Sequence, residues 1–262
     1  AMKGQWLEDL TWSEAAAWRD RSAVVVIPIG AASKEHGHAL PLCTDYLLAR
    51  ALADGVLEKL PVLAAPVLGF GYYPAFRHYP GSQHIRPETF SMLIEDILDG
   101  FVAQGFRNLV IINTGVSTTP VVQVVVREYY ERTGVAVSLA NIVALGQAVE
   151  GLMQQKLGGH GDEHETSMIL AIDEKRVRKD KLVCDYGHQL TQPKTVFYRP
   201  SIFDGDPASG NDYSATGIRG DATLANREKG EAIMAASIAD LVSGIEQLHP
   251  EALANCTGMR QS

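Results

Sequence analysis

The chain has 262 residues, of which 46% are hydrophobic and 21% charged, an ordinary composition for a water-soluble folded protein. Its formal net charge of −8 argues against nucleic acid or an anionic membrane as a partner. No apolar run is long enough to span a membrane, no signal peptide is visible, and the three cysteines are widely spaced. We therefore expect a cytoplasmic protein without a disulfide framework.

Helical and strand patterns alternate along the first half of the chain. In order, the apolar spacing predicts a helix over 11–19, a strand over 23–29, a helix over 45–60, a strand over 62–68, a helix over 88–104, a strand over 108–113, a helix over 120–132 and a strand over 135–142. Thr11 and Glu14 form a capping box at the first helix, and Thr44 is expected to cap the second. Pro66 interrupts the second strand, which should therefore be irregular.

The second half is less regular. It predicts a short helix over 147–157, a helix after Ser167, loops with short strands over 175–220 and a long helix over 221–248. Strands that alternate with helices imply an α/β fold, with parallel strands and helices on both faces of the sheet. No repeat or linker divides the sequence, so we predict a single domain over residues 1–262.

The loop after the strand over 23–29 concentrates polar side chains, namely Lys34, Glu35, His36, His38 and Asp45. Open α/β sheets place their chemistry at the carboxyl ends of the strands. Carboxylates and imidazoles together at such an edge are candidate metal ligands. The alternative is an ordinary solvated loop, and only complementary ligands elsewhere in the chain would favour the metal site.

A second polar group supplies such ligands in the segment His160-Gly-Asp-Glu-His-Glu165. Glycines at 158, 159 and 161 allow close approach of the backbone to a ligand. This segment alone would be read as an acidic loop. Two such groups, each at a loop-to-helix junction of an α/β chain, together favour a metal site.

Two further loops are candidates for substrate binding. The loop over 69–82 combines glycine, proline and aromatic residues, and either lines a pocket or packs as a closed surface loop. The turn over 114–119 offers free N–H groups and hydroxyls for a substrate carboxylate or an oxyanion, unless Thr118 or Thr119 simply caps the next helix. The substrate-binding candidates from the two loops are Tyr73, His78, Thr114 and Ser117.

Several short motifs occur in the order found in one known family. They are Pro28-Ile-Gly, His36-Gly, Leu40-Pro-Leu, Thr44-Asp45, Tyr79-Pro-Gly-Ser82, Asn113 after an aliphatic strand, His160 with Glu165-Thr-Ser, and Gly217-Ile-Arg-Gly-Asp-Ala-Thr-Leu-Ala-Asn-Arg-Glu-Lys-Gly-Glu231. With them the chain resembles the creatininase (creatinine amidohydrolase) family from about residue 8 to residue 247.

The resemblance implies a three-layer α/β/α fold with a mostly parallel central sheet. It also implies metal-dependent hydrolysis of a non-peptide or cyclic amide C–N bond, and a homo-oligomer, often a hexamer. Members of the family typically hold two divalent ions, zinc or manganese. Carried over by position, the metal ligands retained here are His36, Asp45 and Glu165, and His160 matches a histidine used in proton transfer.

The departures from the family concern the metal ligands. The family's first glutamate aligns with Lys34, although one extra residue before His36 would let Glu35 take that place as a fourth ligand. The family's Asn-Gly-His is Asn113-Thr114-Gly115, so one ligand histidine is absent. Three outcomes follow: a site for one ion, a Lys34 ammonium in place of the second ion, or a second site rebuilt from Glu35, His38 and Asp162. We favour one ion, with Lys34 as the second positive charge.

These residues predict an amidohydrolase in which a metal-activated water attacks a small amide. His160 or Glu163 would move the proton to the leaving nitrogen, with Lys34 as a further catalytic group. The alternative is a scaffold or binding protein that kept the fold and lost its metal chemistry. A serine hydrolase built on Ser117 is disfavoured, because no Gly-x-Ser-x-Gly elbow surrounds that residue.

Overall fold

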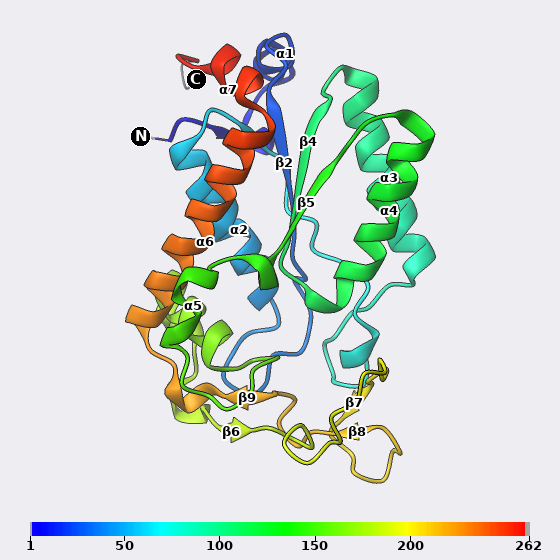
Figure 1. The fold of residues 1–262 in the computed structure, drawn as a ribbon, viewed down its shortest axis with the longest axis vertical. Helices are drawn as coiled ribbons and strands as arrows, with labels where there is room; N and C mark the ends of the chain where they lie inside the picture. The colour runs from blue at the N-terminus through cyan, green and yellow to red at the C-terminus, as the bar shows by residue number, and fades with distance from the viewer. Residues whose placement is uncertain (1, 260–262) are drawn as a thin grey trace.

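A five-stranded parallel sheet forms the centre of the protein (Figure 1), as seen in a computed structural model that describes residues 2–259. The outermost residues of the predicted domain, 1 and 260–262, lie outside the described part. The strands are β1 (Gln5–Trp6), β2 (Val24–Ile29), β3 (Leu63–Ala64), β4 (Asn108–Asn113) and β5 (Ser138–Asn141). Their order across the sheet is β1-β3-β2-β4-β5, and every neighbouring pair is parallel.

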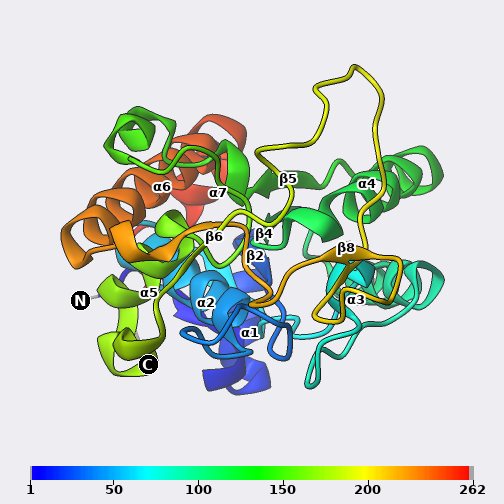
Figure 2. The same ribbon diagram turned by 90° about the horizontal axis from the view of Figure 1, so that it is seen from below.

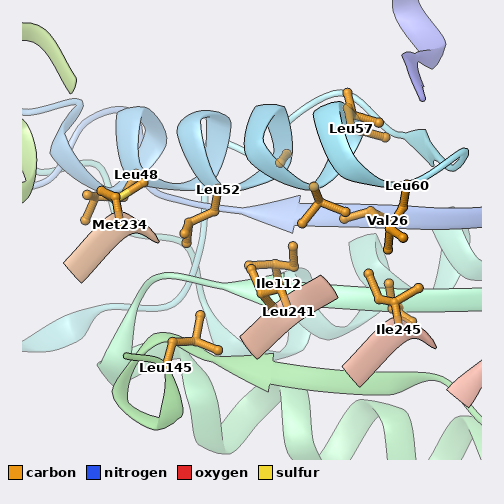
Figure 3. Packing of buried hydrophobic residues seen from close by; sticks show 14 of the residues in the cluster. Val26, Leu48, Leu52, Leu57, Leu60, Ile112, Leu145, Met234, Leu241 and Ile245 are labelled. Carbon is orange, nitrogen blue, oxygen red and sulfur yellow. The ribbon is translucent and has the colours of Figure 1, made fainter. Parts of the chain in front are cut away.

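Helices cover both faces of this sheet. They are α1 (Trp12–Arg19), α2 (Thr44–Lys59), α3 (Pro87–Gln104), α4 (Thr119–Thr133), α5 (Glu163–Asp173), α6 (Arg227–Leu248) and α7 (Pro250–Cys256). Because successive residues of a strand point to opposite faces, Val24 and Val26 pack with α2, α5 and α6, as Figure 3 shows in part. Val25 and Ile27 pack with α1, α3 and α4. The predicted three-layer α/β/α fold is confirmed.

The register of β2 on β4 determines where the functional loops lie. Ile29 pairs with Asn113 at the carboxyl ends of the two strands. The polar loop after β2 and the turn after β4 therefore leave the sheet side by side. Both strands are aliphatic and buried almost throughout, as expected for central parallel strands.

Several element boundaries differ from the predictions. Thr44 does not cap α2 through its side chain; it is the first helical residue, and its hydroxyl donates to the Pro41 carbonyl. The helix predicted over 147–157 is a shorter 3₁₀ helix, Gln147–Leu152, consistent with the low helix propensity of Gly151. The helix predicted from 221 begins at Arg227, where the Asn226 side chain caps it. The strand predicted over 135–142 is confined to β5.

A layer of short strands lies beyond the carboxyl edge of the sheet, at the bottom of Figure 1. The pair β6 (Cys184–Asp185) and β9 (Gly220–Asp221) is antiparallel, and the pair β7 (Phe203–Asp204) and β8 (Asp212–Tyr213) is parallel. This confirms the predicted loops with short strands over 175–220. Among residues 2–259, no helix combines the length and the apolar character needed to cross a membrane.

Two glycines inside helices give a matched test of how α5 and α6 pack. A Cβ at Gly230 of α6 would overlap the Ser167 carbonyl oxygen of α5, whereas a Cβ at Gly100 of α3 would meet nothing within 4 Å. Alanine gains helix propensity at both sites. We therefore expect Gly100→Ala to raise the free energy of unfolding in urea by about 0.5–1 kcal/mol. Gly230→Ala should lower it by about 1–3 kcal/mol. Two shifts of the same sign would contradict the α5–α6 packing.

Candidate metal centre

His36 is the centre of the polar cluster at the carboxyl edge of the sheet. Its ring is buried, and its Nδ1 lies 3.0 Å from the Lys34 carbonyl oxygen. Its Nε2 lies 3.1 Å from Asp45 Oδ1 and 3.2 Å from Glu165 Oε2. A carbonyl oxygen only accepts, so Nδ1 carries a hydrogen, and Nε2 is the nitrogen that faces the two carboxylates.

The electrostatics of the cluster are strongly coupled. Burial alone would lower the pKa of His36, but the Asp45 and Glu165 carboxylates outweigh it and raise this pKa to about 10. Burial would raise the pKa of Asp45, but the Lys34 and His36 charges hold it well below its usual range. The pKa of Glu165 is likewise lowered, against the effect of burial, by His36. The cluster thus holds two ionised carboxylates, Asp45 of α2 and Glu165 of α5, around the His36 ring.

Lys34 supplies a fixed positive charge inside this cluster. Its side chain is buried, and its Nζ donates to Asp45 Oδ2 at 2.8 Å. The ammonium also lies 4.9 Å from the centroid of the Phe76 ring, within the range of a cation–π contact. One oxygen of Asp45 is therefore paired with Lys34 and the other with His36. The sequence left open whether Lys34 or Glu35 faces the metal; in the structure Lys34 pairs with Asp45, and Glu35 pairs with His160.

The position of Asp45 depends on close backbone packing. It lies in the first turn of α2, where a negative charge is favoured by the helix dipole. Its carbonyl oxygen accepts a hydrogen bond from the Thr114 hydroxyl at 3.0 Å. A Cβ at Gly30 would overlap the same carbonyl oxygen, which explains the glycine at the end of β2.

His160 and Glu35 form a second buried pair. His160 Nε2 lies 2.8 Å from the carbonyl oxygen of Glu35 and 2.9 Å from its Oε2. Both partners accept, so Nε2 carries the hydrogen, and Nδ1 is the nitrogen without one in the neutral ring. Burial alone would raise the pKa of Glu35, but His160, His36 and the Gly37 N–H together lower it. The His160 ring stacks on Phe76 at 4.0 Å between centroids.

Three side chains converge closely enough to hold one metal ion. His36, His160 and Glu165 each offer one ligand atom, and these atoms lie within 4.8 Å of one another. Two imidazoles and a carboxylate are ligands that suit zinc or manganese. The Nδ1–H of His36, bonded to a carbonyl, is the outer-shell contact typical of a ligating histidine. The residues present therefore fit a divalent ion.

This set differs from the predicted one. His160, predicted as a proton-transfer residue, joins His36 and Glu165, whereas Glu35, predicted as a ligand, is bonded to His160 instead. Asp45 lies beside His36 but is shared with Lys34. The predicted rebuilt second site of Glu35, His38 and Asp162 is not formed. His38 is exposed, and the Asp162 carboxylate accepts from the N–H of Glu165 and from Gln155.

Glu163, predicted to share proton transfer with His160, does not join the cluster. It is fully buried between α5 and α6, where its carboxylate accepts from Lys229 Nζ at 2.6 Å. It also accepts from the N–H groups of Gln154 and Gln155. Through these contacts Glu163 connects α5 to α6, and they give no support to a role in proton transfer.

The predicted substrate-binding residues lie in different environments. Tyr73 is buried, and its hydroxyl donates to the carbonyl oxygens of Ser33 and Gln83, so it shapes the loop. His78 lies at the surface, with its Nδ1 4.0 Å from Asp204 Oδ2.

The turn after β4 contributes the other two candidates. The Thr114 hydroxyl faces the carbonyl oxygens of Ile29 and Asp45, so it ties β2 to α2. The Ser117 Oγ is buried and has no hydrogen-bond partner among the described residues. Thr118 does not cap α4, because its hydroxyl donates to the Tyr72 carbonyl. Ser117 is thus the hydroxyl of this turn that has a free hydrogen bond to offer.

Sequence reasoning missed the support behind His160. His160 and Arg219 exchange two backbone hydrogen bonds, of 3.1 and 2.7 Å, as an isolated antiparallel bridge. A Cβ at Gly217, whose φ is +90°, would overlap the Glu35 carboxylate. Gly217 and Arg219 belong to the motif Gly217-Ile-Arg-Gly220, to which the sequence analysis gave no role. Because Gly217 has no side chain, the Glu35 carboxylate can lie beside it and accept the hydrogen bond from His160.

Comparisons with known proteins were made by sequence and by structure. The family model described as Creatininase, creatinine amidohydrolase, matches residues 8–245. The creatinine amidohydrolase of Pseudomonas putida is 26% identical over 267 residues, covering 95% of this chain and 98% of the relative. The 3-dehydro-scyllo-inosose hydrolase of Thermotoga maritima is 23% identical, covering 86% and 78%. A mycofactocin precursor peptide peptidase of Mycolicibacterium smegmatis is 24% identical, covering 87% and 86%.

Solved structures agree with the sequence matches. A structure described as manganese creatininase superposes with a TM-score of 0.79 at 26% identity, covering 94% of this chain and 99% of that one. A creatininase variant described as the Zn-Zn type gives a TM-score of 0.76 at 26% identity, covering 94% and 98%. The family model spans most of the chain, and the fold and the predicted motifs agree with it. The protein therefore belongs to the creatininase family.

Proposed function

We propose that this protein is a metal-dependent amidohydrolase that hydrolyses a non-peptide or cyclic amide C–N bond of a small molecule. The convergence of His36, His160 and Glu165 carries this proposal. The names of the relatives support hydrolysis, and two of them are described with manganese or zinc. We further propose one ion per chain, zinc or manganese.

A divalent ion bound to His36, His160 and Glu165 would polarise an amide carbonyl and lower the pKa of a water. Around it, the chain's own residues hold charges and protons. Glu35 fixes the tautomer of His160 by accepting from Nε2–H, which turns Nδ1 towards other partners. Phe76 holds the plane of the same ring and excludes water from one side. The Ser117 hydroxyl is the candidate donor to the substrate.

Lys34 takes the place of a second cation in this proposal. Its ammonium pairs with Asp45 Oδ2 and is buried, so it neutralises a carboxylate that would otherwise be free to bind another ion. A positive charge fixed in a buried site also favours negative charge that develops on the carbonyl oxygen during hydrolysis. Lys34 would thus supply the positive charge of a second ion, but it could not coordinate water or substrate as an ion does.

The second candidate function is that of a scaffold or binding protein without metal. One observation favours it: the buried charges already satisfy one another in a chain from Lys34 through Asp45 and His36 to Glu165. Such a network is stable without an ion only while His36 keeps its proton. Metal content therefore separates the two functions. A single domain, a cytoplasmic location and a hexamer stay predictions.

The first test is the metal content of the purified protein and of Glu165→Gln. We expect one equivalent of zinc or manganese in the wild-type protein, measured by elemental analysis after gel filtration. A neutral amide is a much poorer ligand than a carboxylate. Glu165→Gln should therefore lower the affinity for the metal ion by roughly 100-fold or more and abolish hydrolysis of cyclic amides. Glu174→Gln, at an exposed position, is the control and should bind like the wild type. A wild-type protein without metal would favour the scaffold.

The second test asks whether Lys34 excludes a second ion. Replacing the ammonium by a carboxylate, as in Lys34→Glu, places two acids where one ion pair now stands. We expect Lys34→Glu to bind two equivalents of metal, and Lys34→Arg, which keeps the charge, to bind one. Elemental analysis and calorimetric titration measure the stoichiometry without relying on activity. Two equivalents in the wild type, or one in Lys34→Glu, would refute the role of Lys34.

A further inference from the structure

Two of the three candidate metal ligands lie on one short stretch of chain. We call residues 154–165, which include His160 and Glu165, the ligand segment. The sequence motif over 217–231 packs along it, and Arg219 of that motif exchanges two backbone hydrogen bonds with His160. The helices that begin in these two stretches, α5 and α6, lie side by side (Figure 2). The motif and the ligand segment therefore form one unit beside the candidate metal centre.

Asp162 is the side chain that connects the two ligands of this segment. Its Oδ2 accepts a hydrogen bond at 3.0 Å from the N–H of Gly159, the residue before His160. Its Oδ1 accepts a hydrogen bond at 3.0 Å from the N–H of Glu165, and so caps α5. Each oxygen of one carboxylate thus holds the backbone at one of the two ligands.

The Asp162 carboxylate is buried without a cation. It is 4% exposed, and none of the ion pairs formed among residues 2–259 involves it. Burying a charge is costly unless hydrogen bonds replace its hydration, although the N-terminal end of a helix favours negative charge. A cap alone needs one oxygen, which serine, threonine or asparagine also offers. What aspartate adds at this position is the second oxygen, which holds Gly159.

Gln155 holds the Asp162 carboxylate from the other side. Its Nε2 donates to Asp162 Oδ2 at 2.8 Å. Its Oε1 accepts from the N–H groups of Glu163 and Asp221, at 3.2 and 3.1 Å. Because Asp221 belongs to the motif over 217–231, this one amide connects the motif to the ligand segment.

Two glycines leave room for the pair formed by Gln155 and Asp162. A Cβ at Gly158 would lie 2.7 Å from Asp162 Oδ2 and 2.5 Å from Gln155 Nε2. A Cβ at Gly220, whose φ is +139°, would lie 2.5 Å from Asp162 Cβ. Both contacts are too short for a real side chain. The backbone therefore packs closely around the pair and leaves the carboxylate little room to move.

We propose that Asp162 and Gln155 are positioning residues for the candidate metal centre. The carboxylate fixes the spacing between His160 and Glu165, and the amide fixes the carboxylate. Neither residue belongs to the group that could hold the ion. A preorganised site binds more tightly, because its ligands lose less conformational freedom on binding. The inference rests on the proposed metal site, but not on the reaction or the substrate.

The test is the affinity for zinc, measured by competition with a chromophoric chelator, together with urea unfolding of the metal-free protein. Asp162→Asn leaves one acceptor oxygen, which can serve Glu165 or Gly159 but not both. We expect this variant to lower the affinity for zinc by roughly 10–100-fold, as is typical when a group that supports metal ligands is lost.

Asp240→Asn is the matched control. Asp240 Oδ2 also accepts from a backbone N–H, that of Gly146 at 2.8 Å, but it lies outside the ligand segment. The same chemical change is thus made at a carboxylate that holds no ligand. We expect the affinity of this variant for zinc to equal that of the wild type, even where its stability to urea falls.

Exchanging the two groups separates positioning from stability. Gln155→Glu alone brings two carboxylates into contact where a donor now faces an acceptor, and should also lower the affinity for zinc. In the double variant Gln155→Glu, Asp162→Asn a donor and an acceptor face each other again, and the net charge is that of the wild type. Part of the affinity should therefore return. A general loss of stability would not produce such a recovery.

Three results would each overturn the proposal: wild-type affinity for zinc in Asp162→Asn, an equal loss of affinity in Asp240→Asn, or a double variant that binds more weakly than both single variants. A wild type that binds zinc but hydrolyses no amide would contradict the proposed function alone. Since the measurement is zinc binding, it supports or refutes the role of Asp162 and Gln155 in that case as well.

Discussion

The buried ion pair between Lys34 and Asp45 is the constraint on which the rest of the candidate site depends. Removing two charges from water costs several kcal/mol per ion, and only good geometry and further partners compensate for it. Both are present: a 2.8 Å contact, the first turn of α2 around Asp45, and the Phe76 ring near the ammonium. Loss of either partner would leave an uncompensated charge in the interior. The pair therefore fixes the course of the loop between β2 and α2.

That constraint also decides which ligands remain. Asp45 gives one oxygen to Lys34, so only its Oδ1 faces His36. The candidate ligands come from two distant segments, His36 after β2 and, around the start of α5, His160 and Glu165. A related creatininase is described as the Zn-Zn type. We propose that this chain keeps the fold of that relative and has the Lys34 ammonium in place of a second ion.

Much of the fold follows from local pattern. The aliphatic runs of β2 and β4 and the capping box at Thr11 are short-range signals, and they were read correctly. Thr44 was misread because a cap depends on the backbone angle of the residue before the helix. The 3₁₀ segment near Gly151 reflects weak helix propensity. The late start of α6 reflects the Asn226 side chain, which caps the helix there.

The site was predictable in its members but less so in its pairings. His36, Asp45, His160 and Glu165 were found because dense polar motifs at loop-to-helix junctions stand out. Glu163 was wrongly given a share of proton transfer at the same site as Glu165, although residues two positions apart on a helix point to different sides. Only the structure shows that Glu163 meets Lys229 and that Glu165 meets His36. Likewise, spacing alone could not decide whether Lys34 or Glu35 faces the metal.

X-ray absorption spectroscopy of the zinc-loaded protein tests the central claim most directly. The account predicts one zinc bound by two imidazoles and oxygen ligands, with no metal–metal scattering. A second zinc bridged to the first would appear as a metal–metal distance of about 3.5–4 Å. That signal in the wild-type protein would contradict a site in which Lys34 replaces the second ion.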